Sequence, residues 1–404
     1  MKKTFLCFGL IGLISITYCL FQNIIEWNFG WNDIPKQIDQ EGFTGIQDSS
    51  YLAAISLAEK SARKVQKESS SPSISIAAMI DGKMVWTYAA GMQSIEDKTP
   101  ADTSTLYRIG SVSKAITSMG LGKLIDDEKI SLDSSIQYYT DAFIDKPKIT
   151  LRQLASHQSG IRNYGVCFCF PIWEYYRNKE FSSVKESVDE FSNDPLLFKP
   201  GTDFSYSSYN YTALSFAIEK VANKSFIQYM KNDVFEVLDM KYTQPDIKES
   251  EISNRSVPYE IDRGIFKQSF SVNLSNKWAG GGLLSTPSDL VKVGNVLLDS
   301  TFLNHRTIKE LTTPQVLSDG TINEQNYALG WRHGFSKRYF DGAKQIEVIH
   351  HGGMAVGGLA LLIVYPEYNL VMALTMNRSG QHGRFELFEY IRPIAEIFMK
   401  EIDR

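Results

Sequence analysis

A serine and a lysine, Ser111 and Lys114, stand three positions apart at the start of an apolar stretch of the chain. In the first turn of a helix the two side chains would be neighbours on one face, so the amine could reach the hydroxyl. Burial and the positive end of the helix dipole both favour the neutral amine. A neutral Lys114 could accept the proton of Ser111 and make its oxygen a nucleophile. The same spacing also occurs on solvated helix faces, so the pair indicates chemistry only together with other motifs.

The residues after Ser111 predict the helix that would position this pair. Apolar side chains recur there at the three-to-four-residue spacing of a helix, in two stripes: Val112, Ala115, Ile116, Met119 and Ile125, then Leu121 and Leu124. A helix that is apolar on most sides is buried. Ser111 and Lys114 are therefore expected at the edge of a hydrophobic core.

The composition is that of an ordinary globular protein. The chain has 404 residues, 43% of them apolar and 22% charged, with a net charge of −4, which suffices for one large or two modest domains. The slight acidity and the lack of a basic cluster interleaved with aromatics argue against a nucleic-acid partner. Of the four cysteines, Cys7 and Cys19 lie in an N-terminal apolar run, and Cys167 and Cys169 are too close in sequence to bridge readily. The fold is not expected to depend on disulfides, and the sequence indicates no oligomeric state.

Patterns near both chain ends predict the elements around this centre. Two apolar runs flank the turn Asp81-Gly82 and predict a β-hairpin over 73–89. Thr286 and Pro287 have the pattern of a helix start, with a helix over 290–298. A closing hairpin and a final helix follow at Leu359–Tyr365, Leu370–Met376 and Phe385–Ile402. Residues 26–71 are predicted to be a tether and one helix, so that the catalytic domain spans 72–404.

Four further segments bear on chemistry. A dense set of hydroxyls follows the Pro200-Gly201 turn, from Thr202 to Tyr209, and is expected to form a pocket wall. His157 could be a general base, but a histidine beside Ser and Gly at a helix end more often holds a loop by hydrogen bonds. The glycines in 278–286 lack the framing strand and acidic residue of a dinucleotide site. The pair His350-His351 lacks a third metal ligand. No cofactor and no metal are expected.

Three motifs, occurring in order, together resemble the active-site elements of the serine beta-lactamase and penicillin-binding protein superfamily, class C branch: Ser111-Val112-Ser113-Lys114, an SxxK motif, then Tyr206-Ser207-Ser208 and His351-Gly352-Gly353. From about Pro72 onward the sequence is most similar to the mitochondrial serine beta-lactamase-like branch and its bacterial relatives, at Leu154–Gly160, Asn193–Gly201, Lys277–Gly282 and Tyr327–Trp331. The resemblance implies an α/β fold of the α+β type. In it, an antiparallel sheet built from both chain ends is flanked by helices and packs against an inserted, mainly helical lobe.

The resemblance also implies roles for single residues. Ser111 would be the nucleophile, and Lys114 and Tyr206 would share the proton transfers. The backbone N–H groups of Ser111 and Met354 would form the oxyanion hole. The rest of the substrate site would be lined by Gly353, His351 and Ser208.

Two departures from the lactamase pattern narrow the expected function. Ser208 replaces an asparagine, and His351-Gly352-Gly353 replaces Lys-Thr-Gly, which weakens recognition of a beta-lactam's amide and carboxylate. An unperturbed histidine has a pKa near about 6.5 and is mostly uncharged at neutral pH. We therefore expect a serine hydrolase that forms an acyl-enzyme on a small peptide or an ester. The alternatives are a beta-lactamase, a D-alanyl-D-alanine carboxypeptidase, or a membrane-tethered sensor that binds penicillin or cell-wall peptide without turnover.

The first 25 residues predict a membrane anchor or signal segment. Lys2 and Lys3 precede an uncharged run from Thr4 to Ile25, close to the roughly 20 residues that span a bilayer. A cleaved signal has a shorter apolar region, so an uncleaved anchor is favoured. Cys19 suggests a lipoprotein, but the bulky Tyr18 precedes it where such signals have a small residue. The positive-inside rule places the catalytic domain outside the cytoplasm, in the periplasm or extracellular space.

This interpretation predicts that full-length protein sediments with membranes and that its catalytic domain is digested by protease added outside the cytoplasmic membrane. Cell fractionation and protease accessibility measure both properties. Full-length protein recovered in the soluble fraction without detergent would contradict the anchor.

Overall fold

The computed structural model describes residues 29–35, 42–165, 174–247, 252–379 and 385–404. Within these ranges no helix is both long and apolar enough to cross a bilayer. The predicted anchor, residues 1–25, lies outside the described residues and stays a prediction. All four cysteines lie outside them as well.

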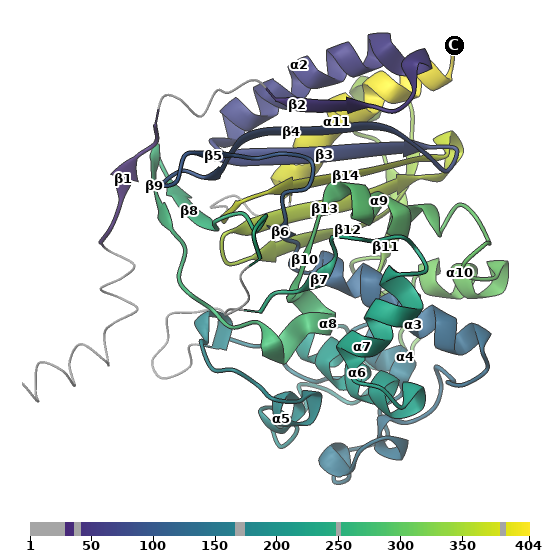
Figure 1. Cartoon of the computed structure of the whole chain (residues 1–404). Coiled ribbons are helices and arrows are strands. Elements are labelled where there is room, and N and C mark those ends of the chain that lie inside the picture. The colour runs from purple at the N-terminus through teal and green to yellow at the C-terminus, as the bar shows by residue number, and fades with distance from the viewer. Residues whose placement is uncertain (1–28, 36–41, 166–173, 248–251, 380–384) are drawn as a thin grey trace, which may run out of the picture.

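A large antiparallel sheet dominates the upper half of the molecule (Figure 1). Its strand order is β11-β12-β13-β14-β3-β4-β2, and β5 pairs with β4. The strands are β2 (Phe43–Ile46), β3 (Ser73–Ile80), β4 (Lys83–Ser94), β5 (Thr99–Pro100), β11 (Arg332–Ser336), β12 (Ile346–Ala355), β13 (Gly358–Tyr365) and β14 (Leu370–Met376). The register pairs Ile80 with Leu370 and Ile74 with Met376, so β3 and β14 join the two chain ends at the centre. The predicted sheet from both ends is confirmed.

Both faces of the sheet are covered. Helices α2 (Leu52–Ser69) and α11 (Phe385–Ile402) lie on the upper face, and α9 (Pro287–Asn295) lies on the lower one (Figure 1). Consecutive residues of β13 therefore enter different cores, with Leu361 in the upper cluster and Leu362 in the lower, and both are fully buried. Each buried leucine contributes about 1.5–3 kcal/mol. Burial on both faces explains why the central strands are apolar throughout instead of alternating.

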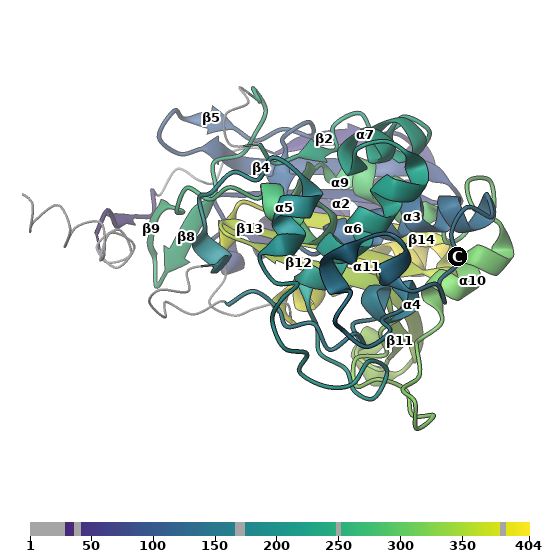
Figure 2. The ribbon, with the colours of Figure 1, turned by 90° about the horizontal axis from the view of Figure 1, so that it is seen from below.

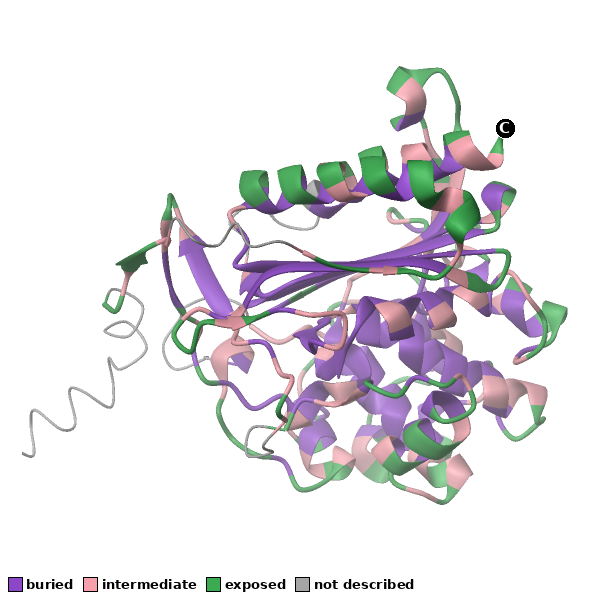
Figure 3. Cartoon of the chain, turned by 45° about the horizontal axis from the view of Figure 1, so that its top comes forward, coloured by how far each residue is buried: buried purple, intermediate pink, exposed green. Residues whose placement is uncertain are grey.

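The predicted domain boundary at residue 72 needs correction. One side of α2 is buried against the sheet and the other is exposed (Figure 3), with Ala58 and Ala62 fully buried in the upper core. Strand β2, from the predicted tether, pairs with β4 between Phe43–Ala89 and Ile46–Trp86. Residues from Phe43 onward thus belong to the same packed unit as the residues after 72.

A mainly helical lobe packs below the sheet. In the view from below, its helices α5, α6 and α7 lie in front of the sheet (Figure 2). The lobe helices are α3 (Val112–Asp126), α4 (Leu151–Ala155), α5 (Val184–Asp189), α6 (Ser208–Ala222), α7 (Phe226–Met230), α8 (Trp278–Gly281) and α10 (His305–Thr312). Two small sheets join lobe and main sheet. One has the order β6 (Tyr107–Arg108), β10 (Leu283–Ser285), β7 (Gln244–Pro245), and the other β1 (Asn32–Asp33), β9 (Ile265–Gln268), β8 (Tyr259–Asp262), β15 (Arg378–Ser379). The α+β architecture is as expected.

The local predictions hold with small shifts. The first hairpin is β3 and β4, and the final hairpin and helix are β13, β14 and α11. The Thr286 hydroxyl accepts the N–H of Asp289 and caps α9, as the sequence indicated. The helix ends at Asn295 and not at 298, because the next N–H groups, of Leu297 and Leu298, bond three residues back in a tighter turn.

Candidate active site

Ser111 stands in the turn between β6 and α3, where the lobe meets the sheet. It precedes the first residue of α3 and is partly exposed, whereas the first three turns of the helix are buried. Gly110 forms the turn with a φ of +48°, and a Cβ on it would lie 2.6 Å from the backbone carbonyl of Met354. Only glycine fits both the left-handed conformation and the space. The turn therefore presents the hydroxyl of Ser111 at the positive end of a helix.

Lys114 is fully buried, and its amine is surrounded by oxygen atoms. Its Nζ lies 3.2 Å from Ser111 Oγ, 2.9 Å from Ser208 Oγ and 2.5 Å from the carbonyl oxygen of Gly280. These oxygens come from the start of α3, from α6 and from α8. An ammonium has three donors, so every one of its hydrogens has an acceptor here. The predicted contact between Lys114 and Ser111 is present.

Tyr206 lies on the other side of the amine. The Lys114 Nζ is 4.8 Å from the centre of its ring, and the guanidinium carbon of Arg332 is 5.4 Å from it. The ring packs on His157, with 4.2 Å between ring centres. The structure thus brings the three residues predicted to be catalytic, Ser111, Lys114 and Tyr206, into one cluster.

His157 has the role of a loop-holding residue, as its sequence context indicated. Its ring is buried, and its Nδ1 lies 3.3 Å from the backbone N–H nitrogen of Ser207 and 3.3 Å from Asn210 Nδ2. Its carbonyl oxygen accepts the N–H of Ser205. These bonds fix the chain on both sides of Tyr206.

Ser208 lies beside the Lys114 amine, and its expected role as a substrate-lining residue stays a prediction. Its hydroxyl contacts the Lys114 amine, and its N–H donates to Asn163 Oδ1 at 2.9 Å. Sequence reasoning missed Asn163 and the carbonyl of Gly280, although both lie in or next to segments that carried the family resemblance. No local pattern marks either one as a partner of the amine or of α6.

The β12 side of the site depends on close backbone contact. A Cβ on Gly353 would lie 1.9 Å from the carbonyl oxygen of Ile109, so β12 can approach the turn before α3 only with glycine at this position. Met354 follows with its backbone against Gly110. This brings the main chain of Met354 beside that of Ser111, as an oxyanion hole requires. The Met354 side chain is 39% exposed and can meet a ligand.

His351 is buried, whereas the sequence suggested a substrate contact. Its Nε2 lies 3.0 Å from the Tyr327 hydroxyl and 3.4 Å from an Arg332 nitrogen, and its Nδ1 lies 2.7 Å from its neighbour's carbonyl oxygen. The geometry favours a positioning role for His351, acting on Tyr327 and Arg332. Sequence reasoning had not selected either of those residues. The proposed substrate contact stays a prediction.

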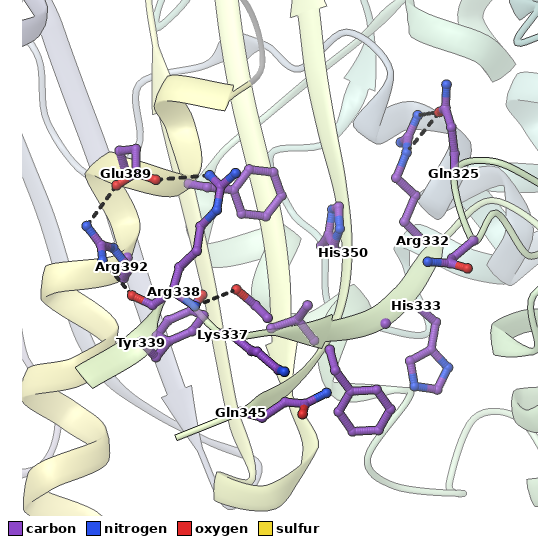
Figure 4. A pocket seen from close by; sticks show the side chains of 16 residues that line it. Gln325, Arg332, His333, Lys337, Arg338, Tyr339, Gln345, His350, Glu389 and Arg392 are labelled. Carbon is purple, nitrogen blue, oxygen red and sulfur yellow. Dashed lines mark hydrogen bonds and ion pairs between the residues drawn. The ribbon is translucent and has the colours of Figure 1, made fainter. Parts of the chain in front are cut away.

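His350 faces the opposite side of β12. Its ring packs edge-on against Phe388 of α11, and it lines a cavity of about 580 Å³ between β11 and α11 (Figure 4). Burial and the charge of Arg332 lower the pKa of His350 to about 3, so it is neutral. Arg332 also lines this cavity, while its guanidinium reaches Tyr206. His350 therefore does not replace His351 in the catalytic cluster.

Within the described residues, no group of three or more His, Cys, Asp or Glu side chains could hold a metal ion. The chemistry at Ser111 is built from side-chain hydroxyls, one amine and backbone groups.

Comparison with known proteins gives one family match. The Beta-lactamase family model matches residues 58–396. The chain is 28% identical over 400 residues to the human (Homo sapiens) mitochondrial serine beta-lactamase-like protein LACTB, covering 78% of this chain and 73% of that protein. It is 24% identical over 291 residues to a D-aminopeptidase of Gluconobacter oxydans (strain 621H), covering 71% and 52% of the two chains.

Solved structures show the same fold. A penicillin binding protein from Bacillus halodurans superposes with a TM-score of 0.69 at 21% identity, covering 82% of this chain and 98% of the other. A D-amino acid amidase from Ochrobactrum anthropi SV3, complexed with D-phenylalanine, gives 0.68 at 21% identity, with 86% and 99% covered. At these identities the likeness supports the architecture alone.

The close approach of β12 yields a prediction for Gly353→Ala. The added Cβ would meet the Ile109 carbonyl, so β12 must shift away from α3 and the N–H groups of Ser111 and Met354 must separate. Loss of one oxyanion donor costs about 10²–10³ in kcat, and we expect a fall of that order in hydrolysis of a chromogenic ester.

The matched control is Gly334→Ala on the neighbouring strand β11, where the nearest atom to an added Cβ is 3.6 Å away. Its kcat should equal that of the unmodified protein. Thermal unfolding of both variants separates local displacement from global loss of structure. A Gly353→Ala protein with unchanged kcat would show that this contact does not set the site.

Proposed function

Because the chain belongs to the Beta-lactamase family of serine hydrolases, we propose that it forms an acyl-enzyme at Ser111 and hydrolyses small peptides or esters. The observation that carries the proposal is the 3.2 Å contact between the buried Lys114 amine and the partly exposed Ser111 hydroxyl. A nucleophile needs an adjacent base and access to substrate, and this pair combines the two.

The oxygens around Lys114 suit both protonation states of the amine. As an ammonium it donates to all three. As a neutral amine it keeps two hydrogens for Ser208 and Gly280, and its lone pair faces the Ser111 hydroxyl. The residue can accept the serine proton without rearrangement, as a general base must.

The proposed reaction has two steps, acylation and deacylation. In the first, Ser111 Oγ bonds to the substrate's carbonyl carbon, its proton passes to the Lys114–Tyr206 pair, and the pair protonates the departing amine or alcohol. In the second, water gives one proton to the pair, attacks the acyl carbon and releases the acid, and the proton returns to Ser111. In both steps the N–H groups of Ser111 and Met354 would stabilise the negative oxygen.

The substrate is proposed to be a peptide or an ester and not a beta-lactam. Ser208 stands in place of an asparagine amide, and the His351 ring, which stands in place of a lysine, is buried against Tyr327 and Arg332. Both changes weaken recognition of a lactam's amide and carboxylate. The relative named as a D-aminopeptidase supports cleavage of amides. A beta-lactamase, a D-alanyl-D-alanine carboxypeptidase and a sensor without turnover remain the alternatives, and the intact cluster of Ser111, Lys114 and Tyr206 favours turnover.

The location outside the cytoplasm also stays a proposal, since it rests on the segment Phe5–Ile25. The LACTB relatives are named as mitochondrial. Their name does not decide on which side of a membrane this chain folds.

The proposed function predicts covalent labelling of Ser111. A fluorophosphonate should add its mass to the peptide that contains Ser111, because the adjacent amine activates that hydroxyl. Mass spectrometry of the digested protein measures this. Ser113→Ala is the control, since Ser113 is buried and bonded to the Gly110 carbonyl, and it should keep the label. Labelling that persists in Ser111→Ala would refute the assignment, and labelling without hydrolysis of any ester or peptide would favour the sensor.

The proposed function also predicts that Lys114 and Tyr206 act as one unit in proton transfer. Lys114→Ala and Tyr206→Phe should each lower kcat by about 10²–10⁴, and the double variant should be little worse than the worse single one. The measurement is a double-mutant cycle on kcat for one ester. Fully additive losses would mean that the two side chains serve separate steps.

A further inference from the structure

Lys277 is a buried lysine for which the proposed mechanism has no use. It stands directly before α8 and is 6% exposed. Its Nζ lies 4.4 Å from the ring centre of Tyr164 and 5.0 Å from that of Tyr175. Across the ranges that the structure describes, it makes no ion pair. Buried lysines are normally paired with a negatively charged group, so this cation lacks the counter-ion that its burial requires.

Its position is beside the catalytic amine. Three residues after Lys277, one helical turn along α8, Gly280 accepts the hydrogen bond of Lys114. Tyr164 follows Asn163, whose side chain binds the first N–H of α6. Both walls of the Lys277 site are therefore continuous with elements that hold Lys114.

Burial and the charges around Lys277 make its protonated form unfavourable in free energy. Burial and the positive charges of Arg108 and Lys114 lower its pKa to about 7, and only Glu174 opposes them, with its carboxylate engaged by Arg162. Because the folded-state pKa lies below that of the unfolded chain, the unfolded state binds the proton more tightly at neutral pH. The lysine thus lowers stability there, and the loss disappears only above the unfolded pKa of about 10.4. A methionine of similar length would avoid this loss, so the fold itself does not require the amine.

We propose that Lys277 binds a carboxylate of the substrate beside the rings of Tyr164 and Tyr175. The inference rests on the proposed function, since it concerns what reaches Ser111. A carboxylate would supply the missing counter-ion through charge-assisted hydrogen bonds. Both rings are half-buried and Lys277 is itself 6% exposed, so this wall partly faces solvent. The contact to a carboxylate that the buried His351 does not offer would then come from the residue directly before α8.

The test uses two pairs of esters, each a carboxylate and its neutral methyl ester. Mono-p-nitrophenyl glutarate carries the charge on the acyl group, and 4-acetoxybenzoate carries it on the leaving group. In Lys277→Met the ratio of kcat/KM, charged over neutral, should fall about tenfold to a hundredfold for one pair, which identifies the side that Lys277 binds. A ratio unchanged in both pairs would overturn the inference.

Two further variants make the result specific. Lys220→Met removes another ring-stacked lysine, exposed on α6 and 5.3 Å from the Phe216 ring centre, and should leave the ratio unchanged. In the wild-type protein the ratio should fall as pH rises past about 7, as Lys277 loses its charge. Lys277→Arg should keep the ratio at higher pH, because arginine stays protonated. A wild-type ratio that does not change from pH 6 to 9 would contradict the role.

A binding measurement separates this inference from the proposed function. Millimolar glutarate should raise the Tm of Ser111→Ala, which cannot turn over, and should not raise that of the double variant with Lys277→Met. The Tm of Lys277→Met alone should match or exceed that of the wild type, which shows that the variant folds. If no ester is hydrolysed but the glutarate shift depends on Lys277, the hydrolase proposal fails and the anion site stands. If esters are hydrolysed but neither ratio nor shift depends on Lys277, only the anion site fails.

Discussion

The site depends on one buried amine that must be surrounded by oxygen. An unpaired ammonium inside a protein is costly, so Lys114 can be fully buried only if its hydrogens find acceptors. The three acceptors come from α3, α6 and α8, at Ser111, Ser208 and Gly280. Satisfying one side chain therefore fixes three elements of the lobe relative to one another. The same contacts place the Ser111 hydroxyl, the proposed nucleophile, within reach of the Lys114 amine.

Strand β12 of the sheet can lie against the turn at Ser111 because glycines leave room for its backbone. Gly353 and Gly110 let two backbones approach to distances that a Cβ would forbid, and this places Met354 beside Ser111. The lobe is thus positioned by polar contacts and the sheet by the absence of side chains. The first constraint selects the hydrogen-bonding partners of the amine, and the second sets the distance between two main-chain N–H groups. The proposed acyl transfer needs both, because Ser111 and Lys114 belong to the lobe and the Met354 N–H belongs to the sheet.

Local patterns in the sequence predicted the elements that carry the site, and distant contacts could not be predicted in the same way. The run after Ser111 has helical spacing and is α3, and the Asp81-Gly82 turn joins β3 to β4. The boundary at residue 72 was wrong because β2, only four residues long, completes the sheet edge by backbone pairing, and so short a strand leaves no periodic signal. Gly280 meets Lys114 through its carbonyl oxygen across 166 positions, and no residue type encodes that. The family resemblance supplied the roles of the motifs, but not the burial of His351.

The burial of His351 changes where substrate charge can be recognised. A buried ring that contacts Tyr327 and Arg332 orders the wall of the site and leaves no exposed surface of its own for a ligand's carboxylate. Lys277, directly before α8, packs its amine on the rings of Tyr164 and Tyr175 and makes no ion pair with another described residue. Evolved proteins keep a destabilising buried group where function requires it. The departure at His351 then has a consequence for substrate charge: β12 carries no lysine there, and under the proposal the amine of Lys277 beside α8 binds the carboxylate instead.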